Sequence, residues 1–244
     1  MIEAVLFDGD QTLWDFEKVM RDALIAVLAD IKAARPGPFA DALRWEDLDH
    51  DRAVVGDERK DVWSLAELRV LGFARTLERR RASEGGDAHA DAELAERIGA
   101  AYFEYRDRDP ALFPDTVGCL DALRGRYRLG LISNGSRLPS TVGLGGYFEA
   151  VVFAQDHRVA KPDKGIFEVV ERELGLAPAA CALVGDHPLN DVVGAKRAGW
   201  HAVWLNREGE GDAFWRLHGH DERPDAVVSS LAELPAVLGV LGPA

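Results

Sequence analysis

Short apolar runs with strand character alternate with helical patterns along most of this chain. The helical patterns carry apolar residues at three- and four-residue spacing, and two of them end in Gly175 and Gly199. A strand that returns through a helix to a neighbouring strand builds a parallel sheet with helices on its faces. The alternation therefore predicts an α/β core with a doubly wound, Rossmann-like parallel sheet. The predicted strands are Val5–Phe7, Leu129–Ile132, Ala150–Phe153, Ala182–Val184, Ala202–Leu205 and Ala226–Val228, and the predicted helices are Asp115–Leu123, Asp163–Leu174 and Asn190–Ala198.

A long segment, from about Asp15 to Asp109, interrupts this alternation. It is far longer than the structureless loops of compact domains, so it must fold by itself. Apolar residues recur at helical spacing in three of its stretches, which predicts an all-helical insertion. The three sets are Met20, Leu24, Val27, Leu28 and Ile31; Trp63, Leu68, Leu71 and Leu77; and Leu94, Ile98, Ala101 and Tyr105. The predicted organisation is a discontinuous core of residues 1–15 and 109–244, with an inserted helical domain of residues 16–108.

Acidic residues outnumber basic ones by 42 to 29, which gives a formal net charge of -13. This charge argues against nucleic acid or an anionic membrane as the partner, and no apolar run approaches the roughly 18 residues of a membrane span. A small anionic ligand would need a local positive site. The two cysteines, Cys119 and Cys181, lie in apolar runs, and the N-terminus carries no secretory pattern, so we expect a cytoplasmic protein. No pattern predicts an oligomeric state.

Two carboxylates stand one residue apart directly after the first predicted strand, at Asp8 and Asp10. The end of such a strand is where parallel α/β sheets hold their chemistry. At roughly 3.3 Å per strand residue, the two acids lie about 7 Å apart along the chain and start on the same face. One carboxylate could attack a substrate atom while the other reaches the leaving group. Trp14 is close enough to Asp10 to line the same pocket, although packing is the simpler interpretation of its ring.

Three further polar clusters follow later strands, and the sheet should bring them to the edge that holds Asp8 and Asp10. They are Ser133–Gly135, Lys161–Asp163 and Gly185–Asp191. A hydroxyl and backbone N–H groups in a glycine-containing turn suit phosphate oxygens, and Lys161 supplies an ammonium. Asp186 and Asp191 add two more carboxylates, and hard oxygen ligands of this kind are what Mg²⁺ prefers.

The charges of these clusters constrain what they can bind. Four converging carboxylates would repel one another strongly in a cleft, and a divalent cation together with Lys161 would offset most of that repulsion. A phosphate dianion then fits if one acid, best Asp10, carries a proton. That protonation state is the one that a general acid requires.

The four clusters, in this order around a helical insertion, resemble the haloacid dehalogenase-like hydrolase superfamily. The resemblance covers essentially the whole chain and points to the subfamily whose helical cap lies between the first and second motifs. It implies that Asp8 is the nucleophile and forms an aspartyl-phosphate, and that Asp10 protonates the leaving oxygen and then activates water. Mg²⁺ would be held by Asp8, the backbone carbonyl of Asp10 and Asp186.

The same resemblance assigns the remaining site residues. Ser133 and Lys161 would bind the phosphoryl group with help from the Asn134 backbone. Thr12, grouped with these phosphoryl-site residues, would position the nucleophile loop. Asp191 would orient Lys161 or a metal-bound water from outside the metal's own ligands.

The expected function is Mg²⁺-dependent hydrolysis of a small phosphorylated metabolite. A phosphomutase would use the same residues and remains an alternative. A 2-haloacid dehalogenase is less favoured, because family members that cleave carbon–halogen bonds lack an acid at the position of Asp10. A catalytically silent metabolite-binding module is the alternative from another class. One departure is visible, since Gln11 stands where the family commonly has glycine.

Overall fold

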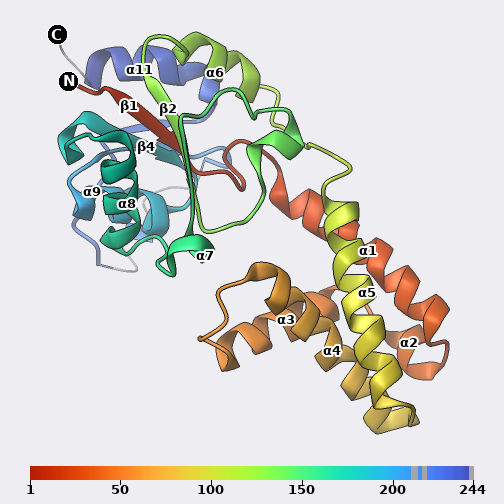
Figure 1. The fold of residues 1–244 in the computed structure, drawn as a ribbon. Coiled ribbons are helices and arrows are strands. Elements are labelled where there is room, and N and C mark those ends of the chain that lie inside the picture. Colours follow the sequence, from red (N-terminus) through yellow and green to blue (C-terminus); the bar gives the residue numbers. More distant parts are fainter. Residues whose placement is uncertain (210–213, 216–218, 242–244) are drawn as a thin grey trace. The chain divides into compact units, whose positions relative to one another are not determined.

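The computed structural model describes residues 1–209, 214–215 and 219–241. These residues divide into two compact units, one of Met1–Asp15 with Ala111–Ala244 and one of Phe16–Pro110. The second boundary thus falls two residues beyond the predicted one at 108/109. The first unit holds the sheet and the second is helical (Figure 1).

The first unit is built on a six-stranded sheet in which every neighbouring pair is parallel. The strand order is β3-β2-β1-β4-β5-β6. From the central β1–β4 pair, β2 and β3 follow toward one edge of the sheet, and β5 and β6 follow toward the other. Crevices at such a reversal, outside the carboxyl ends of the strands, are where α/β sheets bind ligands. The bounds are β1 (Ala4–Phe7), β2 (Arg128–Ser133), β3 (Ala150–Phe153), β4 (Cys181–Gly185), β5 (His201–Leu205) and β6 (Ala226–Val228).

Helices cover both faces of this sheet, with α6 (Thr116–Leu123) and α11 (Leu234–Leu241) on one face and α8 (Lys164–Leu174) and α9 (Gly194–Ala198) on the other (Figure 1). Helix α8 shows why these segments are helical. Asp163 caps its first turn by accepting from the Gly165 N–H, and Gly175 ends it in the left-handed conformation. Its apolar side lies in the core. The shorter segments are α7 (Ala154–His157), η1 (Pro139–Val142), η2 (Pro178–Ala180) and η4 (Leu231–Glu233).

The helix predicted over Asn190–Ala198 differs from the observed one. A π-helical segment, η3 (Pro188–Val193), comes first, and only α9 after it is α-helical. Proline is well suited to a first helical position, and the His187 ring nitrogen accepts from the N–H groups of Leu189 and Asn190. The helical structure therefore begins two residues earlier than the apolar spacing indicates.

The helical unit contains five helices within residues 16–110, all of which the structure describes. They are α1 (Phe16–Ala34), α2 (Pro38–Ala42), α3 (Trp45–Glu58), α4 (Leu65–Glu84) and α5 (Ala88–Arg106). Its core joins residues of α1, α4 and α5, among them Leu24, Phe73 and Ile98. Two buried carboxylates form hydrogen bonds within this unit. Asp51 accepts from Thr76 and Arg79, and Asp91 accepts from the side chains of Arg35 and Arg80.

The chain segments at the junction pair with each other inside the first unit. The Asp15 N–H donates to the Ala111 carbonyl at 2.9 Å, and the Leu13 carbonyl accepts from the Phe113 N–H and from the Thr116 hydroxyl. The loop after β1 is therefore fixed to the segment that returns from the helical unit.

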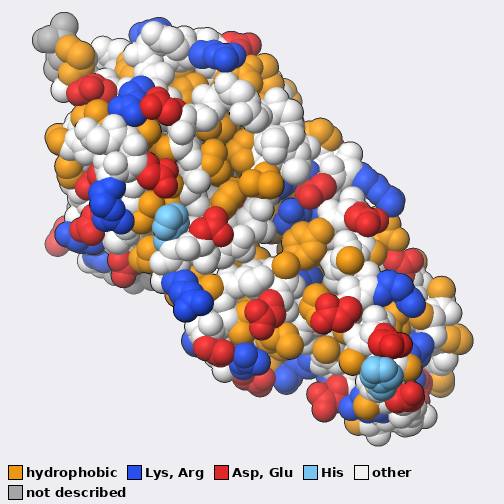
Figure 2. All heavy atoms as spheres, in the orientation of Figure 1, with side chains coloured by type: hydrophobic (Ala, Val, Ile, Leu, Met, Phe, Trp, Pro, Cys, Tyr) orange, Lys and Arg blue, Asp and Glu red, His pale blue; other side chains and the backbone are white. Residues whose placement is uncertain are grey.

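Acidic and basic side chains are interspersed on the face that Figure 2 shows. Within the described residues, no helix has the length and apolar character needed to cross a membrane.

Candidate active site

The polar clusters meet at the carboxyl ends of β1, β2 and β4. Asp8 follows β1, which lies between β2 and β4, and Phe7 is in register with Leu131 and Val184. Ser133 ends β2, and Asp186 follows the last residue of β4. The sheet register therefore brings together side chains that lie more than a hundred positions apart in the sequence.

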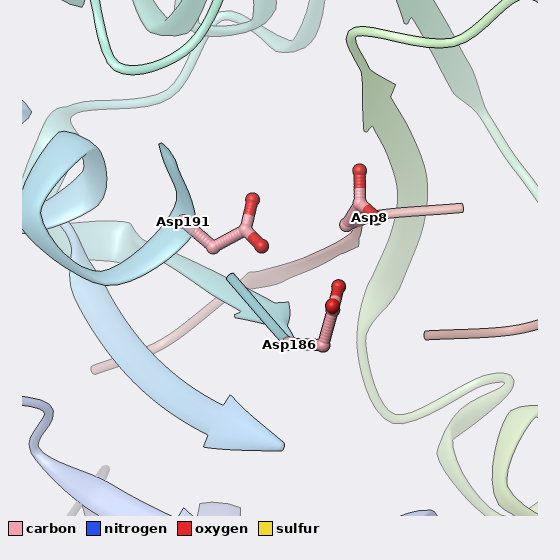
Figure 3. A group of neighbouring side chains, drawn as sticks. All are labelled: Asp8, Asp186 and Asp191. Carbon is pink, nitrogen blue, oxygen red and sulfur yellow. The ribbon is translucent and has the colours of Figure 1, made fainter. Parts of the chain in front are cut away.

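Three carboxyl groups gather at this edge. Figure 3 shows Asp8, Asp186 and Asp191 with their carboxyl groups close together, and one oxygen of each lies within 4.8 Å of the others. Asp8 and Asp191 are buried. Asp191 comes from η3, whose first turn brings its side chain back toward the end of β4.

Lys161 lies between two of these carboxylates. Its Nζ donates to Asp8 Oδ1 and to Asp191 Oδ1, each at 2.6 Å, and its side chain is 2% exposed. Burial opposes the charged ammonium, but the charges of Asp191 and Asp8 and their hydrogen bonds raise the pKa of Lys161 above its ordinary value. The two carboxylates therefore favour the charged form of the lysine. Asp191 has its other oxygen on the His187 N–H, which fixes the carboxylate that orients Lys161.

The cluster carries more negative charge than Lys161 can balance. Burial raises the pKa of Asp8 well above its ordinary value; Lys161 lowers it, and the charges of Asp191, Asp10 and Asp186 raise it. Burial and the charge of Asp191 also raise the pKa of Asp186 to about 7. Both shifts record the cost of holding carboxylates together in a poorly solvated place.

A divalent cation with hard oxygen ligands fits this donor set. The three carboxylates are close enough to contact one ion, and the cluster that they form contains oxygen ligands without cysteine sulfur or histidine imidazole. Each Asp191 oxygen already accepts a hydrogen bond, so Asp8 and Asp186 are the better placed ligands. A bound cation favours the ionised form of the acids beside it, which would reverse the pKa shifts described above.

Asp186 is held from two sides. The Thr12 hydroxyl donates to Asp186 Oδ1 at 3.2 Å, and the Trp204 indole N–H donates to the Asp186 carbonyl at 2.8 Å. Thr12 is fully buried. The family resemblance groups Thr12 with the phosphoryl-binding residues, whereas its hydroxyl in this structure is directed to Asp186. In this structure the Thr12 hydroxyl therefore holds the Asp186 carboxylate in place.

The turn after β2 is organised by its own side chains. Ser133 Oγ accepts from the Gly135 N–H at 3.0 Å, which leaves the hydroxyl proton to donate. The Asn134 side chain pairs with the backbone of Lys161 in both directions, at 3.0 and 2.9 Å. The sequence suggests only a backbone role for Asn134, and its side chain fastens the second cluster to the third. An asparagine after a strand end is too common a signal to have indicated this pairing.

The second acid, Asp10, belongs to a tight turn of residues 9–14. Its Oδ1 accepts from the Trp14 indole N–H at 2.7 Å. Gln11, next to it, has a φ of 59°, in the left-handed region that costs a side-chain-bearing residue roughly 1 to 2 kcal/mol. Glycine adopts this conformation without strain, which explains why the family pattern commonly has glycine at that position. Gln11 adopts the same conformation at the cost of strain.

Arg207, which the sequence does not single out, is hydrogen-bonded to the loop after β1. Its guanidinium donates to the Thr12 carbonyl at 3.1 Å and forms two hydrogen bonds with the Asp115 carboxylate. Although burial opposes ionisation, the hydrogen bonds from Arg207, Ser230 and the Leu231 N–H lower the pKa of Asp115 to about 2. The loop after β1 is thus tied to the segment after β5, 195 positions away.

Comparison with known proteins gives a consistent result. The family model of haloacid dehalogenase-like hydrolases matches residues 2–199. A phosphoserine phosphatase of Thermus thermophilus is 34% identical over 170 residues, which are 66% of this chain and 64% of that protein, just under two thirds of its length. A 5-amino-6-(5-phospho-D-ribitylamino)uracil phosphatase of Escherichia coli is 30% identical over 97% of this chain and 96% of its own.

A solved structure with the same fold bears a different activity in its name. The 2-haloacid dehalogenase of Pseudomonas syringae superposes with a TM-score of 0.81 at 30% identity, over 99% of this chain and 100% of that chain. Fold and overall identity therefore agree with two kinds of hydrolase, and the residues of the site must separate them.

Proposed function

This chain belongs to the haloacid dehalogenase-like hydrolase family, and we propose that within it the protein is a Mg²⁺-dependent phosphatase of small phosphorylated metabolites. The named phosphatase relatives support the reaction class. The observation that carries the proposal is the second acid: Asp10 stands beside the Asp8 cluster, with its carboxyl group next to the Ser133–Gly135 turn. A phosphate ester has a leaving oxygen that needs a proton, whereas a halide leaves without one.

We propose that Asp8 and Asp10 divide the chemistry. An Asp8 carboxylate oxygen forms a bond to phosphorus, the bond from phosphorus to the ester oxygen breaks, and that oxygen takes the proton of Asp10. Asp10, now a carboxylate, then accepts a proton from a water molecule as the oxygen of that water attacks phosphorus. The bond to Asp8 breaks, the electron pair returns to the carboxylate, and inorganic phosphate is released.

The remaining residues hold the phosphoryl group and the cation. The Ser133 hydroxyl and the Asn134 backbone N–H donate hydrogen bonds to the phosphoryl oxygens, and Lys161 contributes a positive charge. Together these groups stabilise the negative charge of the phosphoryl group during transfer. Asp8, Asp186 and the Asp10 carbonyl are the proposed Mg²⁺ ligands, and Asp191 keeps Lys161 in place. When bound, Mg²⁺ supplies positive charge to the phosphoryl oxygens and to the acids around them. We further propose that residues 16–110 act as the cap, which would supply substrate specificity.

The reaction class is tested by measuring two products in parallel. The purified protein is given p-nitrophenyl phosphate and a panel of phosphorylated metabolites, and inorganic phosphate is measured; 2-chloropropionate is given separately, and chloride is measured. We expect phosphate release that requires Mg²⁺ and no chloride release. Chloride release without phosphate release would assign the protein to the dehalogenases. Phosphate transfer to product that needs a bisphosphate activator would indicate a mutase, and no turnover at all a binding module.

The metal is tested by thermal unfolding. We expect Mg²⁺ at a hundredfold excess over its Kd to raise the free energy of unfolding by about 2.7 kcal/mol, and Asp186→Ala to remove most of this gain. At one fixed Mg²⁺ concentration the gain should be larger at pH 8 than at pH 5, because protons compete with the metal for the Asp186 carboxylate at the lower pH. The folded-state pKa of Asp186, about 7, exceeds its ordinary value of 3.8, so the metal-free protein takes up a proton on folding and loses stability as pH rises between these values.

The control for this experiment is Asp156→Ala, which removes an exposed carboxylate of the same unit. It should respond to Mg²⁺ as the original protein does, and NaCl of equal ionic strength with a chelator should give no gain. Equal unfolding temperatures with Mg²⁺ and with chelator, at a concentration that supports catalysis, would contradict a metal in this site.

A further inference from the structure

The side chain of Trp14 is joined to the second acid of the site. Its indole N–H donates to Asp10 Oδ1 at 2.7 Å, and the ring is fully buried. The turn that carries both residues is closed by the backbone, since the Gln11 N–H donates to the Trp14 carbonyl at 2.8 Å. The indole lies so close to Gly9 that a Cβ there would come within 2.5 Å of the ring. The ring is therefore fixed between the nucleophile loop and the carboxyl group of Asp10.

The second oxygen of Asp10 faces the phosphoryl-binding turn. A Cβ on Gly135 would collide with Asp10 Oδ2, so this oxygen lies directly against the backbone of the Ser133–Gly135 turn. The two oxygens of one carboxyl group thus have different surroundings. Oδ1 faces an N–H donor, and Oδ2 faces the place where the phosphoryl group is proposed to bind.

We propose that Trp14 is a positioning residue for Asp10, and that its N–H fixes Oδ1 so that Oδ2 carries the proton given to the leaving oxygen. This inference rests on the proposed phosphatase function. An indole N–H can only donate, so the oxygen that it contacts is held as an acceptor. The transferred proton then moves from Oδ2 to the ester oxygen as the ester bond to phosphorus breaks.

The kind of donor matters for this role. Arg or Lys in the place of Trp14 would form a charge-assisted pair and strongly favour the carboxylate form of Asp10. A neutral donor orients the group without adding charge, so the acid can alternate between its two forms during one turnover. Packing alone does not require the N–H group, because a phenylalanine ring is also apolar.

The first test compares Trp14→Phe with Trp200→Phe. Trp200 is a matched control, since it is buried and its indole N–H donates to Glu171 Oε1 at 2.8 Å, away from the site. Each variant is assayed with phenyl phosphate, whose leaving oxygen needs a proton, and with p-nitrophenyl phosphate, whose leaving group needs it much less. The value of kcat/KM is compared because it reports the step in which the leaving group departs.

We expect Trp14→Phe to lower kcat/KM for phenyl phosphate by about 10- to 100-fold and for p-nitrophenyl phosphate by less than about threefold, because misplacing a catalytic group by about 1 Å has effects of that size. Trp200→Phe should change both substrates equally or not at all. In an Asp10→Asn background, Trp14→Phe should cause no further loss. An equal loss on both substrates, or the same selectivity in Trp200→Phe, would overturn the proposal.

Two further arms make the outcome decisive. 3-Benzothienylalanine at position 14 keeps the two-ring shape and replaces the N–H by sulfur, so it should reproduce the substrate selectivity in a folded protein. If neither replacement of Trp14 folds, the N–H supports folding and the positioning role is rejected. Asp10→Asn is assayed with the same two substrates. If this variant shows no selective loss on phenyl phosphate, the proposed role of Asp10 as proton donor is wrong. If Asp10→Asn shows the selective loss and Trp14→Phe does not, only the proposed role of Trp14 is wrong.

Discussion

Replacing Asp8 by Asn is expected to lower turnover by about 10⁴-fold or more while the protein stays folded. The amide has nearly the shape of the carboxylate but is a poor nucleophile, so no aspartyl-phosphate can form. Lys161 keeps its second contact, with Asp191 Oδ1 at 2.6 Å, and is not left unpaired. Because the substitution also removes one charge from a crowded cluster, we expect the unfolding temperature without metal to stay level or to rise.

The measurement follows both turnover and the covalent intermediate. Acid-quenched protein that has turned over a radiolabelled phosphate ester should carry label on the peptide that contains Asp8, and Asp8→Asn should carry none. Asp156→Asn serves as the control, because it neutralises an exposed carboxylate of the same unit outside the clusters of the site. Label at another residue, or full activity in Asp8→Asn, would remove Asp8 from the proposed mechanism.

The parts of the site that follow from strand ends could be predicted from the sequence. Asp8, Ser133 and Asp186 each come at or just after the end of a strand, and parallel pairing aligns those ends. The apolar runs locate the strands, and the direction of the sheet then decides where the polar residues meet. The fold class is predicted for the same reason, since alternation of strand and helix leaves few arrangements open.

Contacts between side chains and distant backbone could not be predicted in this way. Arg207 reaches the Thr12 carbonyl, and the Asn134 amide pairs with the backbone of Lys161. Both depend on the path of loops between elements, which hydrophobic spacing does not record. Trp14 illustrates the same limit, because its position near Asp10 is visible in the sequence and the direction of its N–H group is not.

The helical unit shows where hydrophobic spacing itself fails. Helix α3 escapes the pattern because its buried positions are Leu48, Asp51 and Val55, and the middle one is a carboxylate. Asp51 is buried because Thr76 and Arg79 satisfy it, and both come from another helix. Trp63, assigned to an apolar helical stripe, lies before the start of α4 at Leu65. A buried polar residue with tertiary partners looks like a surface residue in the sequence.

Asp10→Asn is expected to slow turnover by about 10² to 10⁴-fold, the usual contribution of a general acid and base, while Mg²⁺ binding is retained. Only the backbone carbonyl of Asp10 is proposed to contact the metal, and the substitution leaves that carbonyl in place. The Trp14 N–H should hold the amide in the orientation of the acid, since it can pair with the amide oxygen but not with the NH₂ group. The NH₂ group then faces the Ser133–Gly135 turn in the position of Oδ2.

The variant therefore separates proton transfer from binding. Its Mg²⁺-dependent gain in unfolding temperature should match that of the original protein, and KM for p-nitrophenyl phosphate should change by less than the turnover number. Asp186→Ala should give the opposite pattern, with weak Mg²⁺ binding and a rate that partly recovers at high Mg²⁺, because Asp186 is proposed as a metal ligand and Asp10 as the proton donor. If Asp10→Asn instead lost Mg²⁺ affinity and kept its rate at saturating metal, the roles of the two acids would have to be exchanged.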